Sequence, residues 1–538
     1  MAYYKNLREY LLRLEELDKL VKIKSQVNKD TQLHPMVRLQ FSGLPEEQRK
    51  AFLFENVIDS KGKVYSTPVL VGALAGSSDI YATGMMCKPE EIAIKLTQAQ
   101  LNSIEPEMVD DGAVHEEIHK GTNLLEHGGL DEFPIPISTP GYDCAPFFTA
   151  GCWVTKDPDT GVRNVAVYRS ELRSPTRTGI TFSDVGRHAL IHFLKCKDRG
   201  VPLEAAIVVG GPPNVGYSAV SRAAKDVDEF AVAGGIAGEP LSLVKCKTVD
   251  LEVPAQAEVV VEGELNTEEL ELEGPFGENM GYLGMTEKMP YFTVKCITHR
   301  KNPIWLSFIS QFPPSESSKM RQYAHEGAIY KYLKYDMQIL NVLAVTCHES
   351  TASNALVVIQ IKKTDDVDVF HILKAAGQRL AQSKIIVAVD EDINPRDINA
   401  VNWAIGFRIQ PHRDCHIVRF PAAHLMDPSL ESTDVLIKKR HAAFLAAHPE
   451  TPEASRLLID ATLKWPYPPV SLPKKEFMEE ALRLWEKEGL PDLKLNTPWW
   501  GYELGYWDNE NKEWADLAVK GEYYQTGEIR AQNRIRLE

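Results

Sequence analysis

Ala257-Glu-Val-Val-Val-Glu262 and Tyr291-Phe-Thr-Val294 are the two stretches that decide the fold class of the middle of this chain. Both are rich in β-branched or aromatic residues, and a segment containing glycine and proline separates them. Runs of this kind, bounded by turn residues, are typical of β-strands. We therefore expect a mostly antiparallel sheet or barrel over residues 249–294.

The segments on either side predict a mixture of helices and strands. Near the start, leucines at 7, 11, 14 and 17 recur every three or four residues and predict an amphipathic helix that ends before Lys22. Towards the end, strand-like residues 356–361 and 385–389 flank a helical pattern over 369–380. This alternation is typical of an α/β domain.

Length and composition exclude several classes of protein. A chain of 538 residues exceeds the roughly 250–300 residues that one hydrophobic core supports, so we expect two or three domains. The net charge of −15 argues against nucleic acid or an anionic membrane as partner. The eight cysteines are scattered, and no apolar stretch approaches the roughly 20 residues that span a bilayer. These features predict a cytoplasmic protein with reduced thiols.

Three short motifs suggest enzymes but lack the required context. His115-Glu-Glu-Ile-His119 fits the zinc protease pattern, yet nearby glycines leave no room for the long helix that this site needs. The glycines at 72 and 76 lack the third glycine of a dinucleotide loop, and those at 210 and 211 lack the Gly-Lys-Ser/Thr of a phosphate loop. We expect ordinary turns at both glycine positions.

Two carboxylates frame a tight loop in Glu273-Gly-Pro-Phe-Gly-Glu278. Two acids held close to an arginine can be pushed to different pKa values, so that one stays ionised while the other transfers a proton. An acidic surface turn explains the same pattern. From the residues alone, both interpretations stay open.

Several ordered motifs together resemble the UbiD family of decarboxylases, whose cofactor is prenylated FMN. The resemblance extends from about Tyr4 to Trp465. It is carried by Asn164-Val-Ala-Val-Tyr-Arg169, Asp228-Glu-Phe230, Glu273-Gly-Pro-Phe-Gly-Glu278, Asp392-Ile-Asn394 and Asp460-Ala-Thr462.

The resemblance implies a role for each of a set of residues. Arg169, Glu273 and Glu278 would be catalytic, with Glu278 protonating the carbon that CO2 leaves. Besides Arg169, the implied cofactor contacts are Val167, Tyr168, Arg187 and Lys384. A Mn²⁺ or Mg²⁺ ion would be held by Asn164, His188 and Glu229, with Asp184 or His192 as alternatives to His188. K⁺ is a further implied ion.

The implied activity is reversible decarboxylation of an aromatic or α,β-unsaturated carboxylic acid, or of an aromatic acyl-CoA. The alternative is a noncatalytic or partner-dependent subunit of a multi-component aromatic carboxylase. The implied partners are a UbiX-like flavin prenyltransferase, which supplies the cofactor, and further copies of the chain in a homodimer or homohexamer.

The resemblance also implies a multi-domain fold that combines α/β domains with a β-domain. It predicts an N-terminal α/β domain over 1–125, a central split β-barrel of the flavin-reductase type over 126–320 and a C-terminal α/β domain over 321–494. Residues 495–538 lie outside it, and we interpret them as an extension that could contact another subunit.

Overall fold

An N-terminal α/β unit opens the chain. A computed structural model describes residues 2–182, 187–221, 223–224, 226–422, 427–444, 451–493, 495 and 505–537. The first sheet has five strands, β1 (Leu20–Asn28), β2 (Ala51–Ile58), β3 (Val64–Tyr65), β4 (Val69–Val71) and β21 (Trp305–Ser307). Its helices are α1 (Leu7–Glu16), α2 (Leu33–Gly43), α3 (Ser78–Met85) and α4 (Ile92–Leu101). The predicted opening helix is confirmed as α1.

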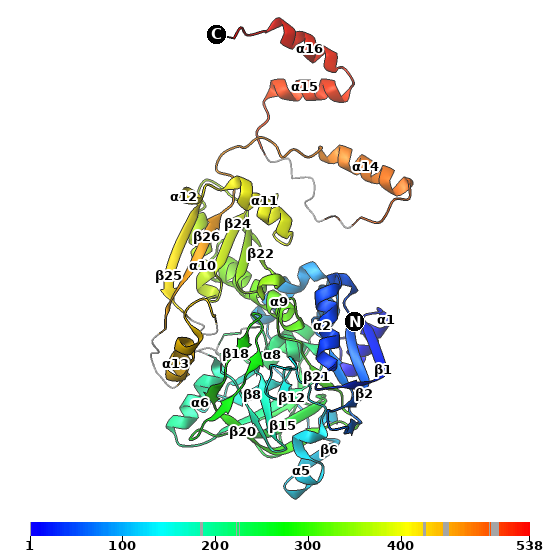
Figure 1. The fold of residues 1–538 in the computed structure, drawn as a ribbon, viewed down its shortest axis with the longest axis vertical. Helices are drawn as coiled ribbons and strands as arrows, with labels where there is room; N and C mark the ends of the chain where they lie inside the picture. Colours follow the sequence, from blue (N-terminus) through cyan, green and yellow to red (C-terminus); the bar gives the residue numbers. More distant parts are fainter. Residues whose placement is uncertain are drawn as a thin grey trace.

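A curled nine-stranded antiparallel sheet forms the middle of the chain (Figure 1). Its order is β7 (Phe147–Phe148), β10 (Ser170–Ser174), β11 (Arg177–Gly179), β20 (Tyr291–His299), β15 (Val259–Leu265), β12 (Leu203–Val209), β8 (Cys152–Lys156) and β9 (Arg163–Val167), with β6 (Glu117–Lys120) also paired to β20. The two stretches quoted first lie in β15 and β20, which pair directly. The expected β-rich middle is therefore confirmed.

Smaller elements surround this sheet. The helices are α5 (Thr122–Glu126), α6 (His188–Asp198), α7 (Pro213–Ser218) and α8 (Glu229–Ala237). A three-stranded sheet contains β5 (Glu107–Met108), β13 (Ser242–Lys245) and β14 (Glu252–Pro254). Two ribbons contain β16 (Glu271–Glu273) with β19 (Glu287–Met289), and β17 (Phe276–Gly277) with β18 (Leu283–Gly284).

A second α/β unit follows the long helix α9 (Glu316–Lys331), which packs against α4 and β22. Its sheet has the order β22 (Val342–Cys347), β23 (Leu356–Ile361), β24 (Ile385–Val389), β26 (Glu453–Asp460) and β25 (Cys415–Pro421). Its helices are α10 (Val369–Arg379), α11 (Ile398–Arg408), α12 (Pro411–Asp414) and α13 (Thr433–Phe444). The predicted alternation of strands and helix is confirmed at β23, α10 and β24.

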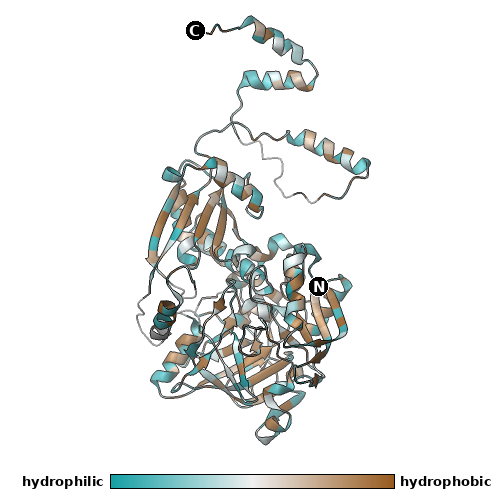
Figure 2. Ribbon diagram, viewed as in Figure 1, coloured by the Kyte–Doolittle hydropathy of each residue, from teal (hydrophilic) through white to brown (hydrophobic). Residues whose placement is uncertain are grey.

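Strand pairing crosses the predicted domain boundaries. β6 precedes residue 126 but joins the central sheet, and β21 precedes residue 320 but joins the N-terminal sheet. The first two units also share one hydrophobic core. Figure 2 shows hydrophobic residues concentrated on the strands of the central and C-terminal sheets. The N-terminal and central units therefore exchange strands and share one hydrophobic core.

Three helices end the chain beyond the last sheet: α14 (Lys475–Lys487), α15 (Asn509–Val519) and α16 (Tyr523–Gln532). Figure 1 shows them projecting away from the sheets. Among the described residues, no helix combines the length and apolar character that crossing a membrane requires.

The protease-like motif does not form a helix. His115 ends a short 3₁₀ turn, and His119 lies in strand β6. The two histidines therefore do not lie one turn apart on one helical face, which the zinc protease site requires. The structure agrees with the interpretation that this motif is not a protease site.

Candidate active site

Arg169 lies between strands β9 and β10, where it contacts two carboxylates. Its Nε and Nη2 donate to the two carboxylate oxygens of Glu273 at 3.1 and 2.7 Å. Its Nη1 forms an ion pair with Glu278. Nε also donates to the hydroxyl of Thr181 at 3.0 Å. The planar guanidinium fixes both carboxylates with little freedom to rotate.

A folded ribbon brings the two carboxylates to Arg169. Glu273 ends β16, the backbone then turns at Gly274 with φ +85°, and Glu278 follows β17. A Cβ at Gly284, on the partner strand β18, would lie 3.1 Å from Oε1 of Glu278. Glycine at position 284 therefore leaves room for the ion pair between Arg169 and Glu278.

Two further charged residues adjoin this trio. Glu287 lies directly opposite Glu273 in the β16–β19 ribbon, and it pairs with Arg440 of α13. Burial raises the pKa of Glu287, and the neighbouring Glu273 adds to this rise, whereas Arg440 and Arg169 oppose it. Burial lowers the pKa of Arg169, but the carboxylates around it, with Glu273 foremost, outweigh burial and raise it overall.

Glu287 and Arg440 are not among the site residues that the sequence predicted. A hairpin register drawn around the Gly-Pro loop could have placed Glu287 opposite Glu273. Arg440 carries no comparable signal, because it reaches the site from a helix far along the chain.

A cavity of about 880 Å³ lies beside the trio. Arg169 and Glu278 line it, whereas Glu273 is fully buried and does not. Of the expected cofactor contacts, Val167, Tyr168 and Arg187 also line this cavity. Its volume lies within the range of ligand and cofactor sites. Glu278 can therefore reach a bound molecule, while Glu273 can act only through Arg169.

The expected metal ligands line the same cavity. They are Asn164 on β9, His188 at the start of α6 and Glu229 at the start of α8. Asn164 is 4% exposed, and its side-chain nitrogen has no hydrogen-bond partner among the described residues. Burial raises the pKa of Glu229 to about 8, although the backbone N–H of Val165 donates to it at 2.7 Å. The amide oxygen of Asn164, a ring nitrogen of His188 and the carboxylate of Glu229 form a mixed oxygen and nitrogen ligand set, which fits a Mn²⁺ or Mg²⁺ ion.

Three of the expected residues lie elsewhere or outside the described chain. His192 does not line the cavity, and its Nδ1 is 2.9 Å from the hydroxyl of Thr155. Asp184 lies outside the described residues. Lys384 lines a separate hollow of about 400 Å³, where it pairs with Asp427 at 2.5 Å. Lys384 as a cofactor contact therefore stays a prediction from resemblance.

Two family models match the chain. The model described as the 3-octaprenyl-4-hydroxybenzoate carboxy-lyase Rift-related domain matches residues 108–313. The model of the corresponding C-terminal domain matches residues 319–461. Glu273 and Glu278 both fall within the first match. Arg440 falls within the second.

Individual proteins match over most of their length. An uncharacterized protein of Archaeoglobus fulgidus is 30% identical over 486 residues, which cover 86% of this chain and 92% of that protein. One similar solved structure is an evolved dimeric form of the UbiD-class enzyme HmfF from Pelotomaculum thermopropionicum in complex with prFMN. It is 30% identical with a TM-score of 0.73, and the match covers 87% of this chain and 97% of the HmfF chain.

A more distant structure shares the fold. Sedimentibacter hydroxybenzoicus vanillic acid decarboxylase in closed form is 24% identical with a TM-score of 0.76. That match covers 90% of this chain and 100% of the other.

Proposed function

The chain belongs to the UbiD family of prenylated-FMN-dependent carboxy-lyases, and we propose that it reversibly decarboxylates an aromatic or α,β-unsaturated carboxylic acid. The observation that carries this proposal is the Arg169 guanidinium held between Glu273 and Glu278 on the cavity wall. An acid–arginine–acid set beside a cofactor-sized cavity is suited to placing a proton on a carbon atom.

Prenylated FMN, when bound, supplies the ring system that accepts the electron pair released as CO2 departs. Val167, Tyr168 and Arg187 lie where they could contact it. Asn164, His188 and Glu229 would hold a Mn²⁺ or Mg²⁺ ion, whose charge would offset that of the acidic cofactor, and the buried carboxyl of Glu229 supports that assignment. K⁺ and Lys384 remain further proposals of the resemblance.

The two carboxylates would play different parts. Glu273 is fully buried and bound by two hydrogen bonds from Arg169, so it fixes the guanidinium. Glu278 lines the cavity and would hold the proton that reaches the carbon after CO2 has left. Glu278 is therefore the proton donor in this proposal, and Arg169 and Glu273 are its positioning partners.

The composition of the cavity wall supports the substrate class. Apolar side chains, including Val220, Phe276 and Met320, line it together with arginines such as Arg321 and Arg379. The apolar side chains in this mixed wall suit an unsaturated or aromatic skeleton, and its cationic groups suit carboxylate and phosphate. The CoA thioester of an aromatic diacid offers the same chemistry, because its free carboxylate would leave as CO2 while the CoA chain stays attached.

The experiment is a substrate panel with the cofactor-loaded enzyme. The chain would be produced together with a flavin prenyltransferase, and cofactor content checked by absorbance. Aromatic and α,β-unsaturated acids, with CoA thioesters of aromatic diacids, would then be assayed for CO2 release. At least one should be turned over. No CO2 release and no hydrogen exchange with any member, despite a bound cofactor, would overturn the proposal.

The same assay separates the alternative of a noncatalytic subunit. If the chain only supports another carboxylase component, Glu278→Gln should leave the activity of the whole complex unchanged. If the chain is the decarboxylase, this substitution should abolish turnover while the flavin stays bound.

A further inference from the structure

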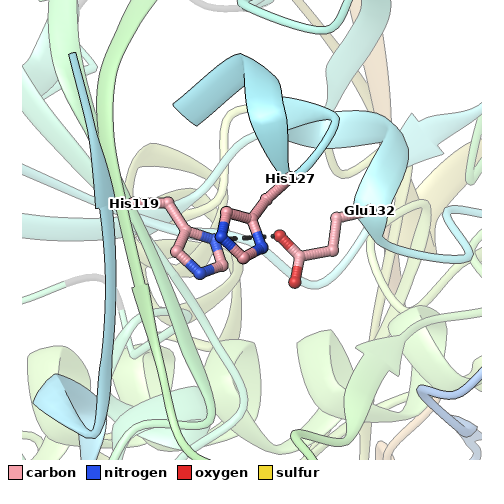
Figure 3. A group of neighbouring side chains, drawn as sticks. All are labelled: His119, His127 and Glu132. Carbon is pink, nitrogen blue, oxygen red and sulfur yellow. Dashed lines mark hydrogen bonds and ion pairs between the residues drawn. The ribbon is translucent and has the colours of Figure 1, made fainter. Parts of the chain in front are cut away.

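Three histidines and one glutamate converge at the edge of the central sheet, away from the cavity described above. Nδ1 of His119 lies 3.0 Å from a carboxylate oxygen of Glu132, and Nε2 of His299 lies 3.5 Å from the other. The rings of His119 and His127 stack with centroids 3.8 Å apart (Figure 3). One ligand atom from each of His119, His127 and Glu132 lies within 4.8 Å of the other two.

The backbone brings these side chains together from separate segments. β6 pairs with β20 in a register that sets His119 opposite Ile297, so His119 and His299 are diagonal neighbours on one face. His127 follows α5 immediately, and Glu132 ends the next 3₁₀ turn. Between them Gly129 has φ +56°, and a Cβ there would lie 2.2 Å from the carbonyl oxygen of Pro175. This tight turn holds Glu132 against the sheet.

His299 is oriented as metal-binding histidines are. Its Nδ1 lies 2.8 Å from the carbonyl oxygen of Arg300, and a hydrogen bond there requires the proton on Nδ1. In the neutral ring this leaves a lone pair on Nε2, which faces Glu132. Nε2 is buried and has no hydrogen-bond partner among the described residues, and His299 is only 5% exposed. A backbone carbonyl that fixes the far ring nitrogen is the usual outer partner of a metal ligand.

We propose that His119, His127, His299 and Glu132 bind a divalent transition metal, with zinc as the preferred ion. Three imidazoles and one carboxylate match the ligands of zinc, whereas Mg²⁺ and Ca²⁺ favour oxygen. Metal–ligand bonds of about 2.0–2.2 Å place tetrahedral ligand atoms about 3.3–3.6 Å apart. The distances from Glu132 to His119 and His299 are already close to that range.

The ion would act as a structural clamp. None of the four ligands is among the residues that line the large cavity, so this site is separate from that of Asn164, His188 and Glu229. Four protein ligands leave no open position for a substrate, which is typical of structural zinc. His127 is exposed, so the ion can enter from solvent. The clamp would fasten the segment from His119 to Glu132 onto β20.

One of the two histidines in the protease-like motif is thus assigned to a different metal site. His119 belongs to the proposed site, whereas Nδ1 of His115 lies 3.3 Å from Asp111 instead. A helical protease site would need both histidines. Substituting each histidine in turn therefore separates the two hypotheses.

The test uses the full-length protein with Glu229→Gln as background, so that the cofactor-metal site does not contribute. After chelator treatment and equilibration with zinc, bound metal is measured by mass spectrometry. The background protein should retain one equivalent of zinc. His127→Ala, chosen because that side chain is exposed, should weaken zinc binding by more than the roughly 10- to 100-fold that loss of an outer partner causes. His299→Ala should do the same.

Two controls and a second readout complete the test. His115→Ala and the exposed His371→Ala should keep the zinc. Zinc should raise the melting temperature of the background protein and of both controls, but not of the His127→Ala variant. The proposal is overturned if the background protein retains no stoichiometric zinc or if His127→Ala retains it fully. Loss of zinc on His115→Ala as well would favour the protease-type site.

Discussion

Arg169 satisfies two carboxylates with one guanidinium, and the two differ in their access to solvent. Glu273 is fully buried, while the Glu278 side chain is 15% exposed. A buried carboxylate needs a fixed cation, since an unpaired charge in the interior is costly. Arg169 therefore stabilises Glu273 and positions Glu278 at the same time.

Arg169→Lys should test whether the shape of the guanidinium, and not its positive charge alone, stabilises Glu273 and positions Glu278. Lysine keeps the cation but cannot donate the two parallel hydrogen bonds that Glu273 accepts from Arg169. We expect kcat to fall by about 10²-fold or more, with the flavin still bound. Arg177→Lys is the matched control, because Arg177 pairs with Glu271 on the outer part of the same ribbon. Wild-type kcat in Arg169→Lys would contradict the assigned role.

Buried His34 should make the free energy of unfolding depend on pH. Burial lowers its pKa to about 3, and its Nε2 is 3.1 Å from the hydroxyl of Ser307. The unfolded chain takes up a proton near pH 6.5 while the folded chain does not. The contribution of His34 to the free energy of unfolding is therefore fully present above pH 6.5. It is lost as pH falls from there towards 3, by about 1.4 kcal/mol per pH unit. We would measure the free energy of unfolding in urea at about pH 7.5 and at about pH 5. Between these two pH values, that free energy should fall less in His34→Gln than in wild type. An equal difference in both proteins would refute this.

At the scale of elements, α13 connects the C-terminal unit to the β16–β19 ribbon, which carries Glu273. It packs against β19, and Arg440 pairs with Glu287. The side chains are 9% and 1% exposed, so water screens this ion pair weakly. The position of α13 therefore affects a carboxylate directly opposite Glu273.

Arg440→Met should leave Glu287 as an unpaired buried carboxyl. We expect a loss of about 3 kcal/mol in the free energy of unfolding and faster amide exchange in α13. Lys439→Met, at a more exposed position on the same helix, is the control. Adding Glu287→Gln to Arg440→Met should recover part of the stability, because the unpaired charge is then gone. No recovery in the double variant would show that the two side chains are not coupled.

Elements with a local signal could be predicted from the sequence. The β-branched runs of β15 and β20 predicted the sheet, and the leucine spacing predicted α1. The trio of Arg169, Glu273 and Glu278 required the family resemblance, because a turn with two acids looks the same on any surface. The site at His119 and His299 was missed, since strand register between distant segments creates it.

At the scale of the whole molecule, the chain ends in helices that contribute little to any core. Thr526 is the only buried residue among the described residues of α15 and α16, while Val519 and Tyr524 are 62% and 76% exposed. Exposed apolar and aromatic side chains on helices of this kind are suited to contact with another subunit. We therefore keep the proposal that this extension is an oligomer contact in a homodimer or homohexamer.

Removing residues 505–538 tests this proposal. Because few contacts are lost, the melting temperature should change by less than about 2 °C. The molar mass from light scattering should fall to that of a smaller assembly. An unchanged mass would exclude the extension as an oligomer contact, and a large fall in melting temperature would show that the body depends on it.

The most direct test of the central claim follows the proton in deuterium oxide. Cofactor-loaded wild type, Glu278→Gln and the exposed control Glu268→Gln are given an acid that the wild type accepts, and CO2 release and deuterium at the product carbon are measured. We predict that wild type and Glu268→Gln release CO2 and label that carbon. Glu278→Gln should retain the flavin but lose about 10²- to 10⁴-fold in rate. Labelling by Glu278→Gln at the wild-type rate would contradict the account.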